Sequence, residues 1–335
     1  PKVLAILAIV GSAATAVAQE PAAIIDYGAR RHATVDARGM VAVQNAIAAE
    51  VGAAVLADGG NAVDAAVAVG MTLAVTLPRA GNIGGGGFMM VYLAEEDRTI
   101  AIDYREAAPL AAGRDVFLDE NGDVDNQLAR VSYRSAGVPG TVAGMHHALT
   151  RYGTMSWAEA LAPAIAVAEA GMRVSPDLAT ALSRRRKWLG RDPATLETFY
   201  KEGGEPYAPG EVLRQPKLAK TLRRIAEDGP DAFYKGPIAA LIVAAMIDND
   251  GLITHEDLAR YRAVEREPVV GSYRGLKIVS MPPPSSARSE RRITVSPVNS
   301  AAAAPFCNTT PVLGSRSVHP LALAVPRPCE GPSVM

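Results

Sequence analysis

The residues with the most evident chemical use are a run of four glycines, Gly84–Gly87, and an arginine that follows it, Arg105. Glycine has no side chain beyond hydrogen, so the run allows the backbone to approach other parts of the chain closely. The next residues predict a strand over 88–93, a turn at 95–98 and a returning strand over 99–105, because apolar residues alternate there. The pattern therefore predicts that Arg105 lies at a strand end beside the glycine run.

A guanidinium group at such a place has two interpretations. Its planar fork stays charged and can donate two parallel hydrogen bonds, which suits it to hold a carboxylate. Exposed arginines also commonly form surface ion pairs, and Asp103 and Glu106 are the neighbouring acidic residues. From residue types alone the ion pair is the more ordinary interpretation of Arg105, and the carboxylate anchor is its alternative.

Other motifs do not complete a catalytic site. No G-x-G-x-x-G spacing runs through Gly81–Gly87 and no Gly-Lys-Ser or Gly-Lys-Thr follows, so the glycines do not predict a nucleotide site. His146 and His147 are adjacent and would point about 100° apart on a helix, so they cannot hold one metal ion together. The sequence has no G-x-S-x-G elbow, and its two cysteines, Cys307 and Cys329, lie in the last tenth of the chain. We therefore predict no metal and no organic cofactor, and no catalytic residue is assigned by type.

Composition limits the possible partners. The chain has 335 residues, a formal net charge of −1 and 49% hydrophobic residues, which is enough for one large domain or two ordinary ones. A nearly neutral balance argues against nucleic acid, because phosphate binding needs a basic excess. The basic run RRRKW at 184–188 predicts a solvated helix face, since no aromatic residue interleaves with its charges. No apolar run is long and bulky enough for a secure membrane span, so no membrane partner is predicted.

The first residues predict export. Lys2 supplies a positive flank, 3–10 an apolar stretch, and Ala16-Val17-Ala18 a small-residue cleavage site, so 1–18 is interpreted as a signal peptide. The alternative is a buried N-terminal helix. The signal peptide predicts a periplasmic or secreted protein.

Local signals predict the elements that would position Arg105. They are a helix over 41–56 ended by Gly59-Gly60, a second helix capped by Asn61 with Asp64 in its first turn, helices over 157–170 and from Ser175-Pro176, a helix capped by Thr254 with Asp257 three residues on, and a hairpin over 267–286.

Five stretches of the sequence occur in one order and at compatible spacing between residues 41 and 286. They read LADGGNAVDAAVA, GNIGGGGFM, DYREAAP, GVPGTVAGMHHAL and SYRGLKIVSMPPPSS. Each alone would be a weak signal, but the ordered set resembles the large-subunit half of the γ-glutamyltranspeptidase (glutathione hydrolase) family.

The resemblance implies an α/β (α+β) fold of the N-terminal-nucleophile hydrolase type, an αββα sandwich with two central sheets between helix layers, incomplete here because the small-subunit half is absent. Members of the family cleave their own precursor, and a threonine becomes the first residue of the small subunit. A free α-amine has a pKa of about 8, so it can act as the base for that threonine's own hydroxyl. The hydroxyl attacks the γ-glutamyl amide and forms an acyl-enzyme, while backbone N–H groups stabilise the oxyanion.

The resemblance also changes the interpretation of Arg105. In DYREAAP it corresponds to the arginine that holds the α-carboxylate of the substrate, and this role becomes the favoured one. The implied substrates are glutathione and other γ-glutamyl compounds, and the implied acceptors are water, amino acids or peptides. The chain would need its own small subunit as a partner.

The chain departs from the family pattern after Ser286. The expected continuation is glycine-glycine, but Ala287 follows, and 287–335 is rich in Ser, Pro, Ala and Arg without a helical or strand period. We interpret this tail as aberrant, either read in a shifted frame or a genuine disordered extension. Thr309-Thr310 comes too soon and lacks the family context of the nucleophile. The predicted organisation is therefore a signal peptide at 1–18, a large-subunit region at 19–286 and the tail at 287–335.

Two other functions remain open. A related acylase acting on glutaryl side chains of β-lactams would share this half of the molecule. A non-catalytic protein that uses Arg105 to bind γ-glutamyl compounds would need no nucleophile.

We predict that this polypeptide alone is poorly soluble and inactive, because the resemblance places the nucleophile and many sheet contacts in the small subunit. Release of chromophore from a γ-glutamyl anilide by the purified chain measures this directly. A monomeric, active chain with no other protein present would contradict the expectation.

Overall fold

The computed structural model describes residues 36–285 and 321–322 of the 335-residue chain. The chain divides into two units, residues 1–38 and residues 39–335. Of the first unit only 36–38 are described, where Arg38 pairs with Asp36 at 3.3 Å. The predicted signal peptide lies outside the described residues, and so does the predicted tail except for residues 321–322.

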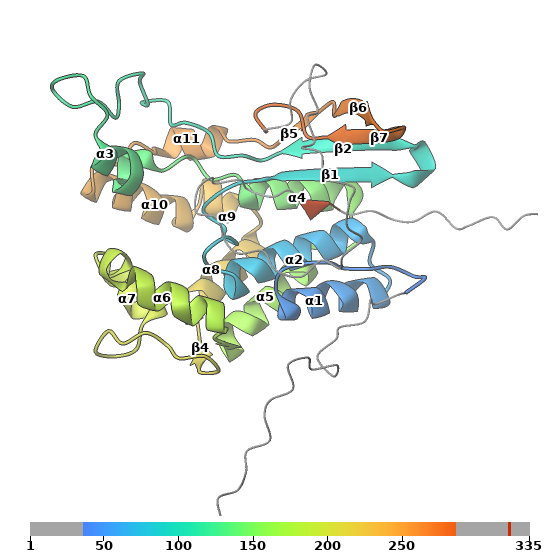
Figure 1. Ribbon diagram of the computed structural model, residues 1–335, viewed down its shortest axis with the longest axis horizontal. Coiled ribbons are helices and arrows are strands. Elements are labelled where there is room, and N and C mark those ends of the chain that lie inside the picture. Colours follow the sequence, from blue (N-terminus) through green and yellow to red (C-terminus); the bar gives the residue numbers. More distant parts are fainter. Residues whose placement is uncertain (1–35, 286–320, 323–335) are drawn as a thin grey trace, which may run out of the picture. The chain divides into compact units, whose positions relative to one another are not determined.

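The described part of the second unit alternates helices with short strands (Figure 1). Its α-helices are α1 (Ala46–Ala57), α2 (Ala62–Thr76), α3 (Asn126–Val131), α4 (Thr141–Tyr152), α5 (Trp157–Ala170), α6 (Pro176–Leu189), α7 (Pro193–Phe199), α8 (Pro216–Asp228), α9 (Asp231–Tyr234), α10 (Pro237–Asp248) and α11 (His255–Arg260). Its strands are β1 (Phe88–Leu93), β2 (Arg98–Asp103), β3 (Met172–Arg173), β4 (Val212–Leu213), β5 (Val264–Arg266), β6 (Val269–Tyr273), β7 (Leu276–Ser280) and β8 (Leu321–Ala322).

The strands form one four-stranded sheet in the order β5-β2-β1-β8 and two smaller pairs, β3-β4 and β6-β7. β1 and β2 are antiparallel, with Phe88 opposite Asp103. β5 is antiparallel to β2, whereas the two-residue β8 is parallel to β1. The sequence pattern of the tail does not predict β8. The described residues are thus a mixed helix and sheet structure, as the sequence predicts.

The β1–β2 hairpin confirms the two predicted strands, with corrections at both ends of the second. β1 has the predicted bounds, but β2 begins one residue earlier, at Arg98, and stops at Asp103, so it does not include Arg105. Tyr104 continues the backbone pairing, because its N–H donates to the Gly87 carbonyl at 3.0 Å and its carbonyl accepts from the Gly87 N–H at 3.2 Å. The pairing ends there because the partner strand has become the glycine run.

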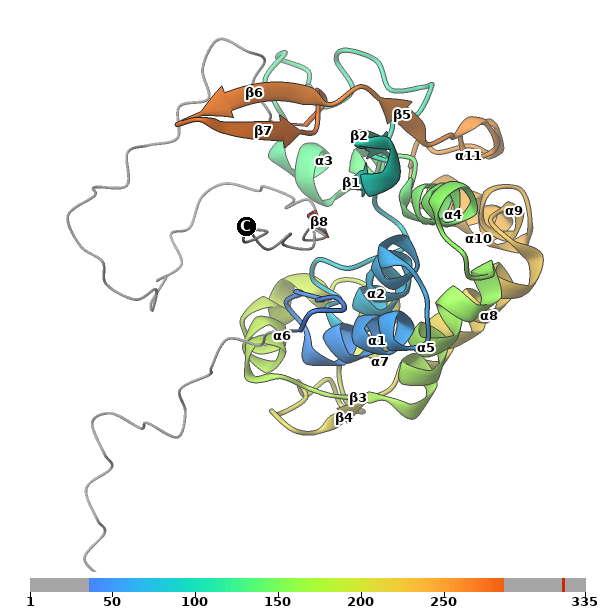
Figure 2. The same cartoon turned by 90° about the vertical axis from the view of Figure 1, so that its right-hand side faces the viewer.

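Both faces of the hairpin are buried. Helices α2 and α4 lie against one face (Figures 1 and 2), where Ile102 belongs to the main hydrophobic core. On the other face Ala101 packs with Phe88 and with Met281, which directly follows β7. A strand buried on both faces is fixed in position more firmly than one with a solvated face, so Arg105 follows a rigid element.

The helical hairpin also forms, with a later start than predicted. α1 begins at Ala46 rather than Val41, because the side chain of Asn45 accepts a first-turn backbone N–H at 3.1 Å and caps the helix there. α2 begins after its predicted cap, Asn61. Gly52 of α1 permits the close crossing, since a Cβ atom at this position would lie 2.7 Å from the side chain of a valine of α2.

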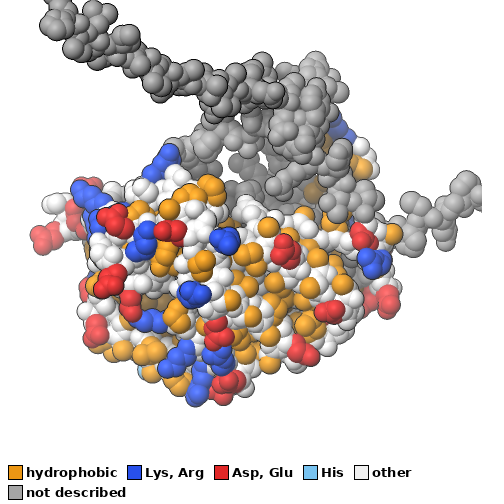
Figure 3. Space-filling model, turned by 90° about the horizontal axis from the view of Figure 1, so that it is seen from below, with side chains coloured by type: hydrophobic (Ala, Val, Ile, Leu, Met, Phe, Trp, Pro, Cys, Tyr) orange, Lys and Arg blue, Asp and Glu red, His pale blue; other side chains and the backbone are white. Residues whose placement is uncertain are grey.

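The remaining local predictions are confirmed. α5 occupies 157–170 and α6 begins at Pro176. Thr254 and Asp257 form the capping box that starts α11, and β6–β7 is the predicted hairpin. The basic run of α6 is exposed, as predicted. On the face of the molecule in Figure 3, basic and acidic side chains are interspersed among apolar ones.

Among the described residues no single helix is long and apolar enough to cross a membrane. One pair of consecutive helical segments, α8 with α9–α10, is long and apolar enough when its parts are taken together. The two segments are bent by 117° at the break between them.

Asp64 in the first turn of α2 joins two helices that are distant in sequence. Its residue is fully buried, and its carboxylate accepts hydrogen bonds from the Asn61 N–H, the Thr154 N–H and hydroxyl, and the Met155 N–H at 2.7–3.0 Å. Burial raises the pKa of Asp64, but the hydrogen bonds from Met155, Thr154 and Asn61 outweigh burial, and the pKa is lowered. The charged carboxylate thereby holds the loop before α5 onto the start of α2.

We predict that Asp64→Asn destabilises the folded chain by about 3 kcal/mol at pH 7. The amide replaces one accepting oxygen with an NH2 group, which cannot accept the hydrogen bonds of the buried donors around it. The lowered pKa means that the stability from Asp64 is fully present above the ordinary carboxyl pKa of about 3.9 and is lost as pH falls below it. The difference between wild type and variant, measured by urea unfolding, is therefore expected to shrink as the pH is lowered through this range.

The matched control is Asp58→Asn. Asp58 is exposed at the end of α1, so its loss is expected to change the unfolding free energy by less than about 0.5 kcal/mol. Equal effects of the two substitutions would contradict the role given to Asp64.

Candidate functional site

Arg105 lies directly after the β1–β2 hairpin, and its backbone is held from two sides. Its N–H donates to Asp103 Oδ1 at 3.0 Å. Its carbonyl accepts from the Tyr261 hydroxyl at 2.8 Å, across 156 residues of sequence. Two fixed hydrogen bonds at one residue limit the rotation of its backbone and so fix the direction in which the side chain leaves the chain.

The guanidinium group itself is exposed and makes no ion pair among the described residues. It lies over the Phe88 ring, with Cζ 5.9 Å from the ring centroid. The interpretation of Arg105 as a surface ion-pair partner of Asp103 or Glu106 is therefore wrong for this structure. Asp103 instead accepts from Arg266 Nε of β5 at 2.8 Å.

The glycine run forms the support beneath Arg105. A Cβ atom at Gly86 would lie 2.5 Å from the Tyr104 carbonyl oxygen and 2.7 Å from the Glu106 nitrogen. A Cβ atom at Gly87 would lie 2.9 Å from the Tyr104 ring. The prediction that the glycines allow a close backbone approach is confirmed, and the backbone that they approach is the segment that carries Arg105.

The run is fixed in turn by the start of α4. The Gly85 carbonyl accepts from the N–H groups of Gly140 and Thr141 at 2.6 and 3.0 Å. The Gly85 N–H donates to Asn82 Oδ1 at 2.6 Å, and the Thr141 hydroxyl donates to the same oxygen at 3.2 Å. These contacts hold the run between α4 and the hairpin.

Three buried tyrosines pack next to the backbone of Arg105. Tyr234 and Tyr261 stack with ring centroids 5.8 Å apart and an interplanar angle of 7°, and Tyr104 is buried beside them. Gly140 fits here because a Cβ atom would lie 2.1 Å from the Tyr261 hydroxyl oxygen. Burial raises the pKa of each of these tyrosines above the ordinary phenol value, so their hydroxyls stay protonated and can donate.

The two adjacent histidines of α4 have different partners. The rings of His146 and Trp157 form a T-shaped pair, with centroids 5.1 Å apart. His147 Nε2 lies 2.9 Å from Glu265 Oε1. Within 36–285, no group of three or more His, Cys, Asp or Glu side chains is arranged to hold a metal ion.

Sequence reasoning found Arg105 and the glycine run but missed the residues that hold them. Gly140 lies in the stretch GVPGTVAGMHHAL. A glycine directly before a helix is a local signal that another part of the chain approaches closely there. Tyr261 and Arg266 carry no local signal, because their contacts depend on chain folding over more than 150 residues. Arg105 is not among the residues lining the cavities of about 340 and 370 Å³ in the described part of the chain.

The arrangement around Arg105 can bind an anion. The Arg105 guanidinium has no acidic partner among residues 36–285, and it lies on a fixed backbone beside an aromatic ring. It can therefore offer two parallel N–H donors to a planar carboxylate. Both cysteines of the sequence lie outside the described residues.

We predict that Gly86→Ala destabilises the chain by about 1–3 kcal/mol, because the added methyl meets backbone atoms of 104–106, which cannot move aside as a flexible side chain can. Gly84→Ala is the matched control in the same run, since a Cβ atom at Gly84 meets nothing within 4 Å. Chemical denaturation of both variants measures the difference. If Gly84→Ala were as damaging as Gly86→Ala, the close approach at Gly86 would not be the constraint.

Comparisons with known proteins show which proteins this chain resembles. The family model for gamma-glutamyltranspeptidase matches residues 48–289. A glutathione hydrolase proenzyme of Escherichia coli (strain K12) is 49% identical over 280 residues, which cover 82% of this chain and 48% of that protein. The acylase ACY 1 proenzyme of Pseudomonas sp. (strain SE83) is 39% identical over 269 residues, covering 78% of this chain and 48% of that one. The crystal structure of Helicobacter pylori gamma-glutamyltranspeptidase superposes with a TM-score of 0.74 at 45% identity, covering 76% of this chain and 73% of that chain. The chain spans about half the length of the curated relatives it matches.

Proposed function

The chain belongs to the gamma-glutamyltranspeptidase family, and we propose that it forms the donor-binding half of an enzyme that hydrolyses or transfers the γ-glutamyl group of glutathione and related γ-glutamyl amides. Its fold is that of the N-terminal-nucleophile hydrolases in this family. The observation that carries the proposal is the position of Arg105 within the family match, on a fixed backbone and with a guanidinium that makes no ion pair with another described residue.

Arg105 would hold the α-carboxylate of the γ-glutamyl donor. A carboxylate placed on the guanidinium fork leaves the rest of the γ-glutamyl chain extended away from it, so the γ-amide is held at a constant distance from the anchor. Phe88, under the guanidinium, restricts the side chain without neutralising its charge. The anchor would thus orient the substrate and take no part in bond breaking.

The reacting groups would come from the half of the family length that this chain does not span. An N-terminal threonine would attack the γ-amide carbon, with its α-amine as the base that accepts the hydroxyl proton. The C–N bond then breaks, and the leaving amine takes up that proton. Water would hydrolyse the resulting ester to glutamate, or the amine of an amino acid or peptide would take the γ-glutamyl group.

We extend the proposal to processing and location. The names of the relatives include the word proenzyme, which supports maturation into two subunits. The pattern of 1–18 supports export to the periplasm or beyond the cell, and this segment lies outside the described residues. The family match at residues 48–289 supports the proposed large-subunit region at 19–286.

A related acylase activity is the second candidate, because an acylase proenzyme is 39% identical and shares the same region. The γ-glutamyl reading is preferred because the glutathione hydrolase proenzyme reaches 49% identity over a similar span. Rates on a γ-glutamyl anilide and on a glutaryl β-lactam distinguish the two candidates.

We predict that Arg105→Lys in the complete, matured protein raises KM for a γ-glutamyl anilide by about 10- to 100-fold, with a smaller effect on kcat. Lysine keeps the charge but loses the two-pronged geometry, so donor binding is weakened more than the chemical step. Steady-state kinetics measure the two parameters separately.

The matched control is Arg98→Lys, at the other end of β2, where Arg98 pairs with Glu96 on the surface. This substitution is expected to leave both parameters unchanged. An unaltered KM for Arg105→Lys would overturn the role of Arg105 while leaving the family assignment in place.

A further inference from the structure

Helix α10 turns an apolar face to solvent. Leu241 and Ile247 on this face are 71% and 76% exposed, which are the highest values among the large apolar residues of the described part of the chain. Ala240 and Ala244 are exposed as well, and Pro237 begins the helix on the same side. At 3.6 residues per turn these five side chains fall within about 120° of the helix circumference. Soluble proteins rarely expose such a continuous apolar stripe unless another surface covers it.

The opposite side of α10 belongs to the core. Ala239, Val243 and Met246 are buried there and are part of the main hydrophobic cluster. The helix packs against α9 and α11 (Figures 1 and 2). α10 is therefore apolar on two sides, and the packing of the described residues accounts for only one of them.

The two ends of α10 differ in charge. Lys235 lies before the first turn, where the helix dipole is positive, and its ammonium pairs with Asp231 at 3.0 Å on the surface. Asp248 is the last helical residue, where the dipole is negative, and it makes no ion pair within 36–285. A carboxylate at this end is unfavourable, so a positive group that came close to Asp248 would stabilise it.

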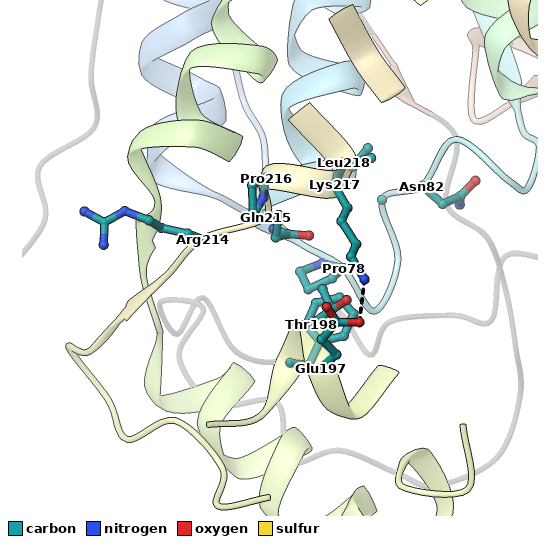
Figure 4. Close-up of a pocket in the computed structure, with 12 residues that line it drawn as sticks. Pro78, Asn82, Glu197, Thr198, Arg214, Gln215, Pro216, Lys217 and Leu218 are labelled. Atoms are coloured by element: carbon teal, nitrogen blue, oxygen red, sulfur yellow. Dashed lines mark hydrogen bonds and ion pairs between the residues drawn. The ribbon is translucent and has the colours of Figure 1, made fainter. Parts of the chain in front are cut away.

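The polar groups around the cavity of about 340 Å³ beside α8 already have partners in the chain. The ammonium of Lys217 pairs with Glu197 (Figure 4). The amide of Gln215 donates to the Val75 carbonyl at 2.8 Å. That cavity is satisfied by the chain itself, whereas Asp248 and the apolar face of α10 are not.

We propose that α10 packs antiparallel against α10 of a second copy of this chain, about a two-fold axis at the level of Ile242. Such an axis requires a self-complementary face. Ala240 and Ala244 lie equally far from Ile242 along the helix, one on each side. Pro237 and Ile247 do so too. Ala240 therefore faces the second copy's Ala244, and these small side chains let the helix axes approach to about 8 Å.

The same register brings opposite charges together at the helix ends. Asp248 of each copy lies beside the second copy's Gly236 and Lys235, at the positive end of that helix. The charges also favour a protein over a lipid surface as the occupant. The acidic residues Asp248 and Asp250 follow the apolar face, whereas helices that lie on membranes are rich in lysine and arginine.

Sedimentation velocity of the complete, matured protein over a range of concentrations tests the contact. A pair of helices of 12 residues each buries less than a standard interface of about 1,600 Å², so we expect a reversible dimer with a Kd of about 1–100 µM. Leu241→Glu is expected to raise this Kd at least about tenfold, because the new carboxylate would be buried without a partner near the axis. The control is Trp188→Glu, which changes an exposed apolar residue of α6 and is expected to leave the Kd unchanged.

An exchange of charges tests the antiparallel register. Lys235→Glu and Asp248→Lys are each expected to weaken the dimer about three- to tenfold, and the double variant is expected to restore it. The two residues are about 20 Å apart along one helix, so they cannot pair within a single copy. A double variant that associates no better than the single variants would overturn the proposal.

Other outcomes would assign the face to a different occupant and refute the second copy. A protein that stays monomeric, but whose matured yield falls with Leu241→Glu, would show that the rest of its own polypeptide covers α10. Sedimentation with phosphatidylglycerol vesicles that Leu241→Glu abolishes would show a lipid surface. Hydrolysis of a γ-glutamyl anilide by Leu241→Glu is expected to be unchanged, because Leu241 is exposed and lies outside the contacts that hold Arg105. The dimer and the proposed function can therefore fail separately.

Discussion

The close approach of the glycine run to the backbone of 104–106 is the constraint on which the arrangement around Arg105 depends. At Gly86 the two segments are so near that a methyl group would meet a carbonyl oxygen at 2.5 Å. The same run pairs with the hairpin through Gly87 and with the start of α4 through Gly85. One short stretch without side chains therefore joins a strand pair, a helix start and the residue that carries the guanidinium.

The charge on Arg105 remains available because the neighbouring acid is engaged elsewhere. Asp103 is nearly buried, and its two oxygens accept from Arg266 and from the Arg105 backbone N–H. A buried carboxylate needs such partners, since an unpaired charge in the interior is strongly unfavourable. The acid nearest in sequence thus fixes the backbone of Arg105 but does not neutralise its side chain.

The parts of the fold that sequence could predict are those with local causes. The bounds of β1 and α5 and the capping boxes at Asn61 and Thr254 follow from alternation, helical spacing and caps within four residues. The predicted start of α1 is too early, because the apolar pattern continues on both sides of its cap, Asn45. The contact of Tyr261 with Arg105 and the orientation of Gln215 against Val75 could not be predicted, because they join residues 156 and 140 positions apart.

The two polar arrangements at Arg105 and Asp64 differ in how they respond to salt. The guanidinium of Arg105 is exposed and makes no ion pair with another described residue, so its attraction for a carboxylate acts through water and is weakened as ionic strength rises. The carboxylate of Asp64 is buried and accepts hydrogen bonds from the backbone N–H groups of Thr154 and Met155, so these contacts are screened much less. The first arrangement is therefore suited to bind and release an anion, and the second to hold two segments of the fold together.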